Sequence, residues 1–131
     1  ANSEEERYQQ ESIYLIDQWC NMYERKIQEL GGIGFFLGGI GPDGHIAFNV
    51  RGSDHNSTTR LTQTNFETQA AAAVDLGGIE ISRNRLVITI GLGSITYNKN
   101  ATAIIIAAGE AKAPIVQKSI ESKQDIMYPA S

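Results

Sequence analysis

The feature of this sequence that most constrains its fold is the alternation of short apolar runs with segments of helical periodicity. Three runs rich in β-branched and other apolar residues have the length of buried strands: 33–37, 86–90 and 102–107. Three segments have helical spacing or capping signals: 4–30, 64–78 and 109–122. We further expect a short edge strand within 59–64 and a turn at 91–94. This alternation is typical of an α/β fold with a mainly parallel sheet, so we expect a three-layer α/β/α, Rossmann-like architecture.

The number of elements suggests that the domain is larger than this sequence. A chain of 131 residues fits one domain or part of one. Three main strands make a small sheet, and three helices cover two faces thinly. We therefore expect residues 1–131 to be one portion of a single, larger α/β domain.

Composition excludes several classes of partner. The formal net charge is −4, which gives no general attraction to nucleic acid or to an anionic membrane surface. The longest apolar stretch, 103–108, is far shorter than a membrane span. A single cysteine, Cys20, excludes an internal disulfide and fits a reducing compartment, and the N-terminus has no signal-peptide pattern. We expect a cytoplasmic protein in which Cys20 is inert on an apolar helix face.

The segment that carries candidate chemistry is the glycine-rich loop at 38–49, which follows the first predicted strand. In open α/β sheets, ligands bind beyond the carboxyl ends of strands, and glycines let the backbone approach a ligand closely. Asp43 and His45 lie two residues apart in this loop, where a carboxylate can orient an imidazole for proton transfer. The residues alone leave open an ordinary turn with a capping Asp and a structural His. We read His55 as a solvated loop residue, and we predict neither a metal nor a cofactor.

The sequence Gly-Ile-Gly-Pro-Asp-Gly-His-Ile-Ala-Phe-Asn at 39–49 resembles the signature of the glucosamine-6-phosphate deaminase/isomerase family. The shorter Gly-Pro-Asp-Gly-His is similar to the 6-phosphogluconolactonases, which share that fold, but the continuation through Asn49 favours the deaminases. Three downstream segments match the family in order: Thr59-Arg60, 88–95 and 108–113. The resemblance covers about residues 15–121.

The resemblance implies a phosphorylated amino sugar as substrate and conversion of glucosamine 6-phosphate to fructose 6-phosphate and ammonia. It implies that His45 assists opening of the sugar ring, that Asp43 supports His45, and that Lys112 binds the phosphate. An ammonium beside free helix N–H groups suits a dianion on physical grounds as well. The remaining candidates are for substrate binding: Gly39, Gly41, Gly44, Asn49 and Arg60.

Several departures from the family pattern qualify this prediction. Val50 stands where the family usually has a glutamate that joins the Asp–His pair, so that Asp43 alone, or Asp54, has to orient His45. Residues 70–75 lack the phosphate-binding arginine of many deaminases, and the candidate replacements are Arg51, Arg60 or a residue outside this sequence. Thr62 replaces a basic residue of the allosteric members, so allosteric activation is not predicted.

The resemblance also implies that the base that removes the C2 proton belongs to an N-terminal half outside this sequence. Residues 1–131 are then the C-terminal portion of the domain, and on their own they should lack full activity. Two alternatives remain: a lactonase-like hydrolase and a non-catalytic sugar-phosphate-binding domain. A sheet edge left open would favour self-association, so a homo-oligomer is possible.

Overall fold

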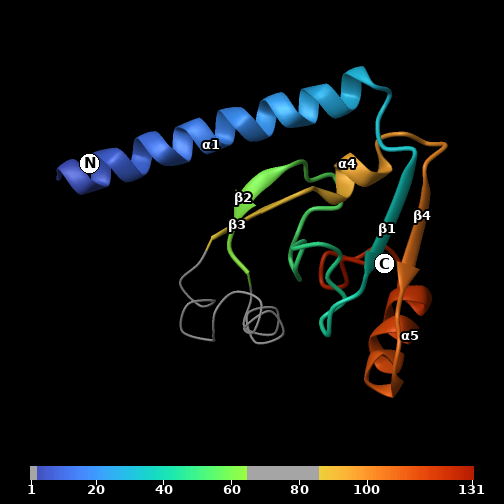
Figure 1. Ribbon diagram of the computed structural model, residues 1–131. Coiled ribbons are helices and arrows are strands. Elements are labelled where there is room, and N and C mark those ends of the chain that lie inside the picture. Colours follow the sequence, from blue (N-terminus) through green and yellow to red (C-terminus); the bar gives the residue numbers. More distant parts are fainter. Residues whose placement is uncertain (1–2, 65–85) are drawn as a thin grey trace.

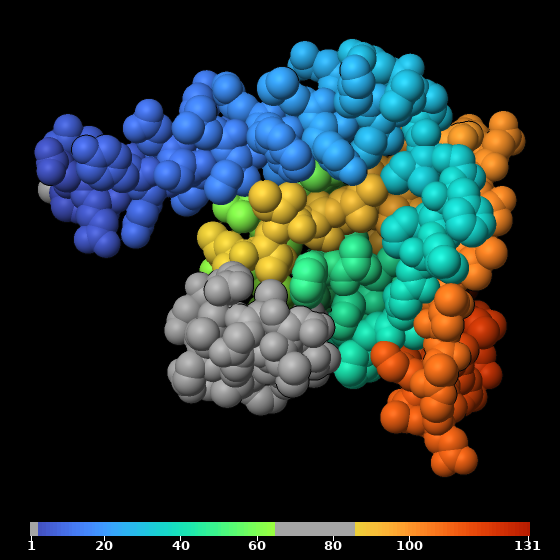
Figure 2. Space-filling view, viewed as in Figure 1, coloured from blue at the N-terminus to red at the C-terminus, as the bar shows by residue number. Residues whose placement is uncertain are grey.

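The computed structural model describes residues 3–64 and 86–131. Helix α1 (Glu4–Glu29) matches the predicted first helix. The Ser3 hydroxyl caps it by accepting from the Glu6 N–H, and three glutamates in its first turn complement the helix dipole. Gly31 and Gly32 end it with φ values of 89° and 93°, which favour glycine. The N-terminal part of α1 projects beyond the rest of the molecule (Figures 1 and 2).

Strands β1 (Phe35–Gly39) and β4 (Thr102–Ile106) form a parallel pair in which Leu37 lies opposite Ile104 (Figure 1). The mixed α/β class with a parallel sheet is thereby confirmed. The first strand begins two residues later than predicted and includes Gly38 and Gly39. All five residues of β4 are exposed among the described residues, although parallel strands are normally covered on both faces.

Strands β2 (Arg60–Thr62) and β3 (Val87–Thr89) form a separate antiparallel pair. The edge strand at 59–64 is confirmed, but the expectation that the strand at 86–90 joins the parallel strands is wrong. Val87 and Thr89 are buried while Ile88 is exposed, which is the period-2 pattern of a strand covered on one face. The helix predicted at 64–78 lies almost entirely outside the described residues.

A short helix, α4 (Leu92–Thr96), occupies the segment where we predicted only a turn. Two glycines at its start hide the helical signal in the sequence. They are needed there because a Cβ on Gly91 would lie 2.0 Å from the Ser57 carbonyl oxygen, and one on Gly93 would lie 2.6 Å from the Asn56 backbone. The Gly93 N–H donates to the Ser57 oxygen at 2.8 Å. The glycines therefore let the loop before β2 pack directly on α4.

The 3₁₀ turn η1 (Glu110–Lys112) leads into helix α5 (Ala113–Glu121), whose first turn contains Pro114, where backbone N–H groups lack intrahelical partners. The buried core joins the glycine loop to α4 and α5 through five residues: Ile40, Ile46, Leu92, Ile95 and Ile115. This core fixes the position of the loop that carries Asp43 and His45. Within the described residues, no helix is long and apolar enough to cross a membrane.

Candidate active site

The glycine loop closes tightly after β1. The Gly41 N–H donates to the His45 carbonyl at 3.0 Å, and the Gly44 N–H donates to the Gly41 carbonyl at 2.9 Å. This closure lays the His45 ring against the Gly41 backbone, where an added Cβ would come within 1.8 Å of the imidazole. Gly44 has φ 84° and lies against Ile115. The loop conformation therefore needs glycine at 41 and 44 for two different reasons, space and backbone angle.

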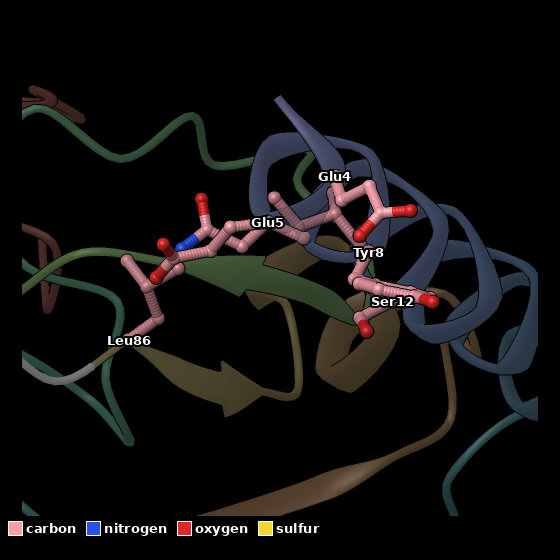
Figure 3. Close-up of a pocket in the computed structure, with 7 residues that line it drawn as sticks. Glu4, Glu5, Tyr8, Ser12 and Leu86 are labelled. Carbon is pink, nitrogen blue, oxygen red and sulfur yellow. The ribbon is translucent and has the colours of Figure 1, made fainter. Parts of the chain in front are cut away.

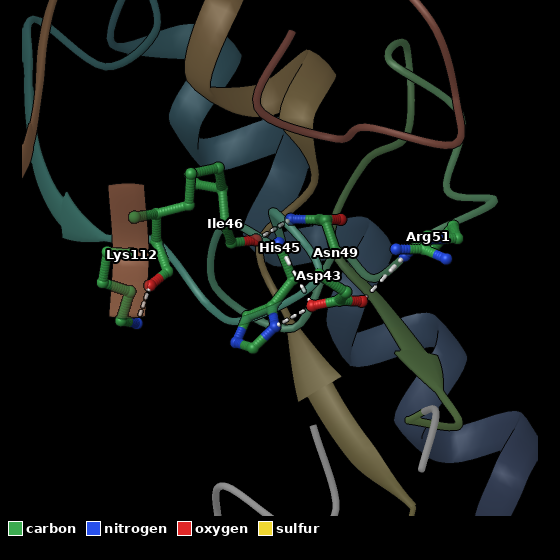
Figure 4. Close-up of polar contacts among 7 residues, drawn as sticks. Asp43, His45, Ile46, Asn49, Arg51 and Lys112 are labelled. Atoms are coloured by element: carbon green, nitrogen blue, oxygen red, sulfur yellow. Dashed lines mark hydrogen bonds and ion pairs between the residues drawn. The ribbon is translucent and has the colours of Figure 1, made fainter. Parts of the chain in front are cut away.

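Asp43 and His45 form the polar centre of the site (Figure 4). His45 Nδ1 lies 2.6 Å from Asp43 Oδ1, and the two side chains are 16% and 1% exposed. Asp43 also accepts from the His45 N–H and, through Oδ2, from the Arg51 N–H, both at 3.4 Å. An ionised carboxylate can only accept, so the neutral ring carries its proton on Nδ1. Nε2, on the opposite side of the ring, is then the basic nitrogen.

Lys112 brings a positive charge to the same place. Its ammonium donates to the carbonyl of Ile40 at the end of β1 (Figure 4). Four predicted site residues meet in one pocket of about 320 Å³, which Ile40, Pro42 and Ala47 also line: Gly39, Gly41, His45 and Lys112. The pocket combines an imidazole for proton transfer, a cation and closely approachable backbone. Such groups can transfer a proton and bind an anion.

Asn49, which we predicted to bind substrate, lies in the interior and is 0% exposed. Its Nδ2 donates to the carbonyls of Ile46 at 3.0 Å and Ile90 at 2.7 Å. Its Oδ1 accepts from Arg60 Nη1 at 2.8 Å and from Ser57 Oγ at 3.4 Å. These contacts use both donors and both acceptor positions of the amide. Asn49 therefore ties the loop to the end of β3 and to Arg60.

Arg60 lines a different pocket, of about 480 Å³, together with Val50, Arg51 and Asp54. Its Nη2 donates to Ser53 Oγ at 3.3 Å. Burial lowers the pKa of the Arg60 guanidinium and the charge of Asp54 opposes that shift, but an arginine remains charged at neutral pH. Arg60 and Lys112 thus present their charges in separate pockets.

The carboxylate that contacts His45 is Asp43. Asp54, the alternative suggested by the missing glutamate at position 50, accepts from the Asn56 N–H at 2.8 Å and so caps its own turn. Val50 lines the Arg60 pocket. The imidazole therefore has an orienting carboxylate without a glutamate at position 50.

Sequence reasoning missed or misread three residues. Glu24 is 7% exposed and hydrogen-bonds to Thr59 and Ser94. Its position four residues after the buried Cys20 is the signal that could have placed it on the buried helix face. Ala47 lines the site with φ 52°, a left-handed conformation that no local pattern predicts. His55 is not a solvated residue: it is half-buried, and its Nε2 is buried with no hydrogen-bond partner in the described structure.

Other cavities lie away from this chemistry. One of about 930 Å³ lies beside the start of α1 and is lined by Glu4, Glu5, Tyr8 and Leu86, among others (Figure 3). Its described lining contains carboxylates and no lysine or arginine, which is unsuited to a phosphate. Across residues 3–64 and 86–131, no group of three or more His, Cys, Asp or Glu could hold a metal ion.

Comparison with known proteins finds sequence relatives that match most of this chain. No family model matches the chain. A glucosamine-6-phosphate isomerase of Candida albicans is 38% identical over 117 residues, covering 88% of this chain and 47% of that protein. A glucosamine-6-phosphate deaminase 2 of Xenopus laevis is 40% identical over 112 residues, covering 86% of this chain and 40% of that protein. The chain thus spans less than half the length of these curated relatives.

A solved structure of a monomeric glucosamine-6-phosphate deaminase matches with a TM-score of 0.75 at 32% identity, covering 85% of this chain and 45% of that one. The parallel strand pair, with an Asp–His pair and a lysine beyond the carboxyl end of β1, defines an α/β protein with a site suited to proton transfer on an anionic ligand. The sequence and structural matches show that the chain is homologous to part of the length of glucosamine-6-phosphate deaminases and isomerases.

Proposed function

We propose that the protein carrying this chain acts on a phosphorylated amino sugar, converting glucosamine 6-phosphate and water to fructose 6-phosphate and ammonia. The reaction couples an aldose–ketose isomerisation to hydrolytic loss of the amine. One observation carries the proposal: His45 Nδ1 lies 2.6 Å from Asp43 Oδ1, in a pocket that also contains Lys112. The names of the relatives supply the substrate class.

The proposed roles follow from this geometry. Asp43 holds the Nδ1–H tautomer and stabilises the imidazolium, so that His45 Nε2 can move a proton at the pyranose ring oxygen. An ammonium has three N–H donors, so Lys112 can keep its bond to the Ile40 carbonyl and still donate to phosphate oxygens. Gly39 and Gly41 let the backbone reach the sugar. Gly44 and Asn49 hold the loop in place. Arg60 is the candidate for a further ligand contact from its own pocket, separate from that of Lys112.

The proposal also includes a larger domain, of which this chain is one portion. Residues 1–131 form the C-terminal portion of one three-layer, Rossmann-like domain, and the remainder supplies the C2 base. Apolar side chains of β1 and β4 that are 46–60% exposed support this: Phe35, Leu37, Ile104 and Ile106. Trp19 and Tyr23, stacked at 5.3 Å and exposed on α1, offer a further contact surface for the rest of the domain or for a homo-oligomer. The single cysteine supports a cytoplasmic location.

The test is ammonia release from glucosamine 6-phosphate by the whole polypeptide that carries this chain, with His45→Ala as the control. Release that depends on His45 supports the proposal. Hydrolysis of a phosphorylated sugar lactone without ammonia release would replace it with a lactonase activity. Binding of the sugar phosphate without turnover would replace it with a binding role.

A further inference from the structure

Glu24 of α1 is a buried carboxylate that accepts three hydrogen bonds through a single oxygen. Its Oε2 lies 3.2 Å from the Thr59 backbone nitrogen, 2.9 Å from Thr59 Oγ1 and 2.7 Å from Ser94 Oγ. Thr59 and Ser94 are themselves 5% and 0% exposed. A carboxylate that leaves water needs such donors, because burial without them is strongly unfavourable.

These donors come from two segments, one of which leads directly into Arg60. Thr59 immediately precedes Arg60, the first residue of β2, and Ser94 lies in the first turn of α4. Helix α1 packs along β2, with α4 beside them (Figure 1). One carboxylate oxygen of Glu24 therefore links α1 to the start of β2 and to α4.

From Arg60, hydrogen bonds continue to the glycine loop that carries Asp43 and His45. Arg60 Nη1 donates to Asn49 Oδ1 at 2.8 Å, and Asn49 Nδ2 donates to the Ile46 carbonyl at 3.0 Å. Ile46 directly follows His45 in the chain. From the α4 side, the Leu92 N–H donates to Ser57 Oγ, which in turn donates to Asn49 Oδ1. Both branches from Glu24 thus converge on Asn49.

We propose that Glu24 is a positioning residue for the deamination reaction: it sets the location of Arg60 and, through Asn49, the orientation of the His45 loop. The inference rests on the proposed function for its kinetic consequence but not for its geometry. An ionised oxygen accepts more strongly than an amide oxygen, so Glu24→Gln keeps the shape and weakens all three bonds. A displacement of about 1 Å in a reacting group can lower a rate on the order of 100-fold.

The test compares Glu24→Gln with Glu29→Gln, the same chemical change at an exposed position of α1. Thr59→Val is a second variant that removes one hydroxyl donor and leaves the carboxylate in place. In the whole polypeptide, we expect Glu24→Gln to lower kcat roughly 10- to 100-fold with a smaller change in KM. Thr59→Val should lower kcat in the same direction and Glu29→Gln should have no effect.

A second readout separates this inference from the proposed function. In the ¹⁵N NMR spectra of the folded protein, Glu24→Gln should shift the His45 Nδ1 and Arg60 Nε signals, and Glu29→Gln should leave them in place. Those shifts support the positioning role even if the wild-type protein releases no ammonia. Unchanged signals and unchanged kcat in folded Glu24→Gln protein, with only a lower Tm, would overturn it and leave Glu24 a purely structural residue.

Discussion

Replacing Gly41 with alanine should displace the His45 ring from Asp43. An added Cβ would lie 1.8 Å from Cε1, 2.0 Å from Nδ1 and 2.4 Å from Nε2 of that ring. Ordinary van der Waals contact begins at 3.4 Å, so the ring has to withdraw by roughly 1.6 Å. A withdrawal of that size stretches the 2.6 Å contact between Nδ1 and Asp43 beyond hydrogen-bonding distance.

The expected cost is a fall in kcat on the order of 100-fold, equivalent to about 2.7 kcal/mol of transition-state stabilisation. The assay is ammonia release from glucosamine 6-phosphate, with the chemical shift of His45 Nδ1 as a direct measure of the contact. Gly34→Ala is the matched control, because its Cβ would meet nothing within 4 Å and its φ lies outside the left-handed region. An unchanged rate together with an unchanged Nδ1 signal in Gly41→Ala would refute the argument that Gly41 makes room for the imidazole.

Three further predictions concern stability and reactivity. Asn49→Ala removes the side-chain hydrogen bonds of the amide to Ile46, Ile90 and Arg60, so it should lower the free energy of unfolding by about 3 kcal/mol in urea titrations. A loss below about 1 kcal/mol would contradict the assignment of Asn49 as the anchor of the loop. Ala47→Gly relieves a left-handed φ of 52° and should raise that free energy by roughly 1 kcal/mol, and a lower Tm would argue against strain there. Burial, and secondarily the charge of Asp17, raises the pKa of the Cys20 thiol, so native protein at pH 8 should label roughly 100-fold more slowly than unfolded protein. Equal labelling rates would show that Cys20 is accessible.

The sequence by itself determined the elements whose signals are local. Ser3, the first-turn glutamates and Gly31-Gly32 mark both ends of α1, and Pro114 marks the first turn of α5. The two-residue spacing of Asp43 and His45 in the glycine loop allowed a carboxylate–imidazole pair, and the structure shows that contact at 2.6 Å. Capping, turn geometry and short-range contacts need no knowledge of the rest of the chain.

Only the tertiary structure decided which elements pair and which polar groups face inward. The sequence could not show that β3 pairs antiparallel with β2, because strand pairing depends on residues far apart in the chain. No local pattern predicts that the Asn49 side-chain amide forms all its hydrogen bonds inside the protein, with Ile46, Ile90, Ser57 and Arg60. Glu24 and Ser94 are 70 residues apart, and a glutamate on a helix normally indicates a solvated face. Each of these polar side chains is buried because the fold brings hydrogen-bond partners to it, and that condition is set by the packing of separate segments rather than by local sequence.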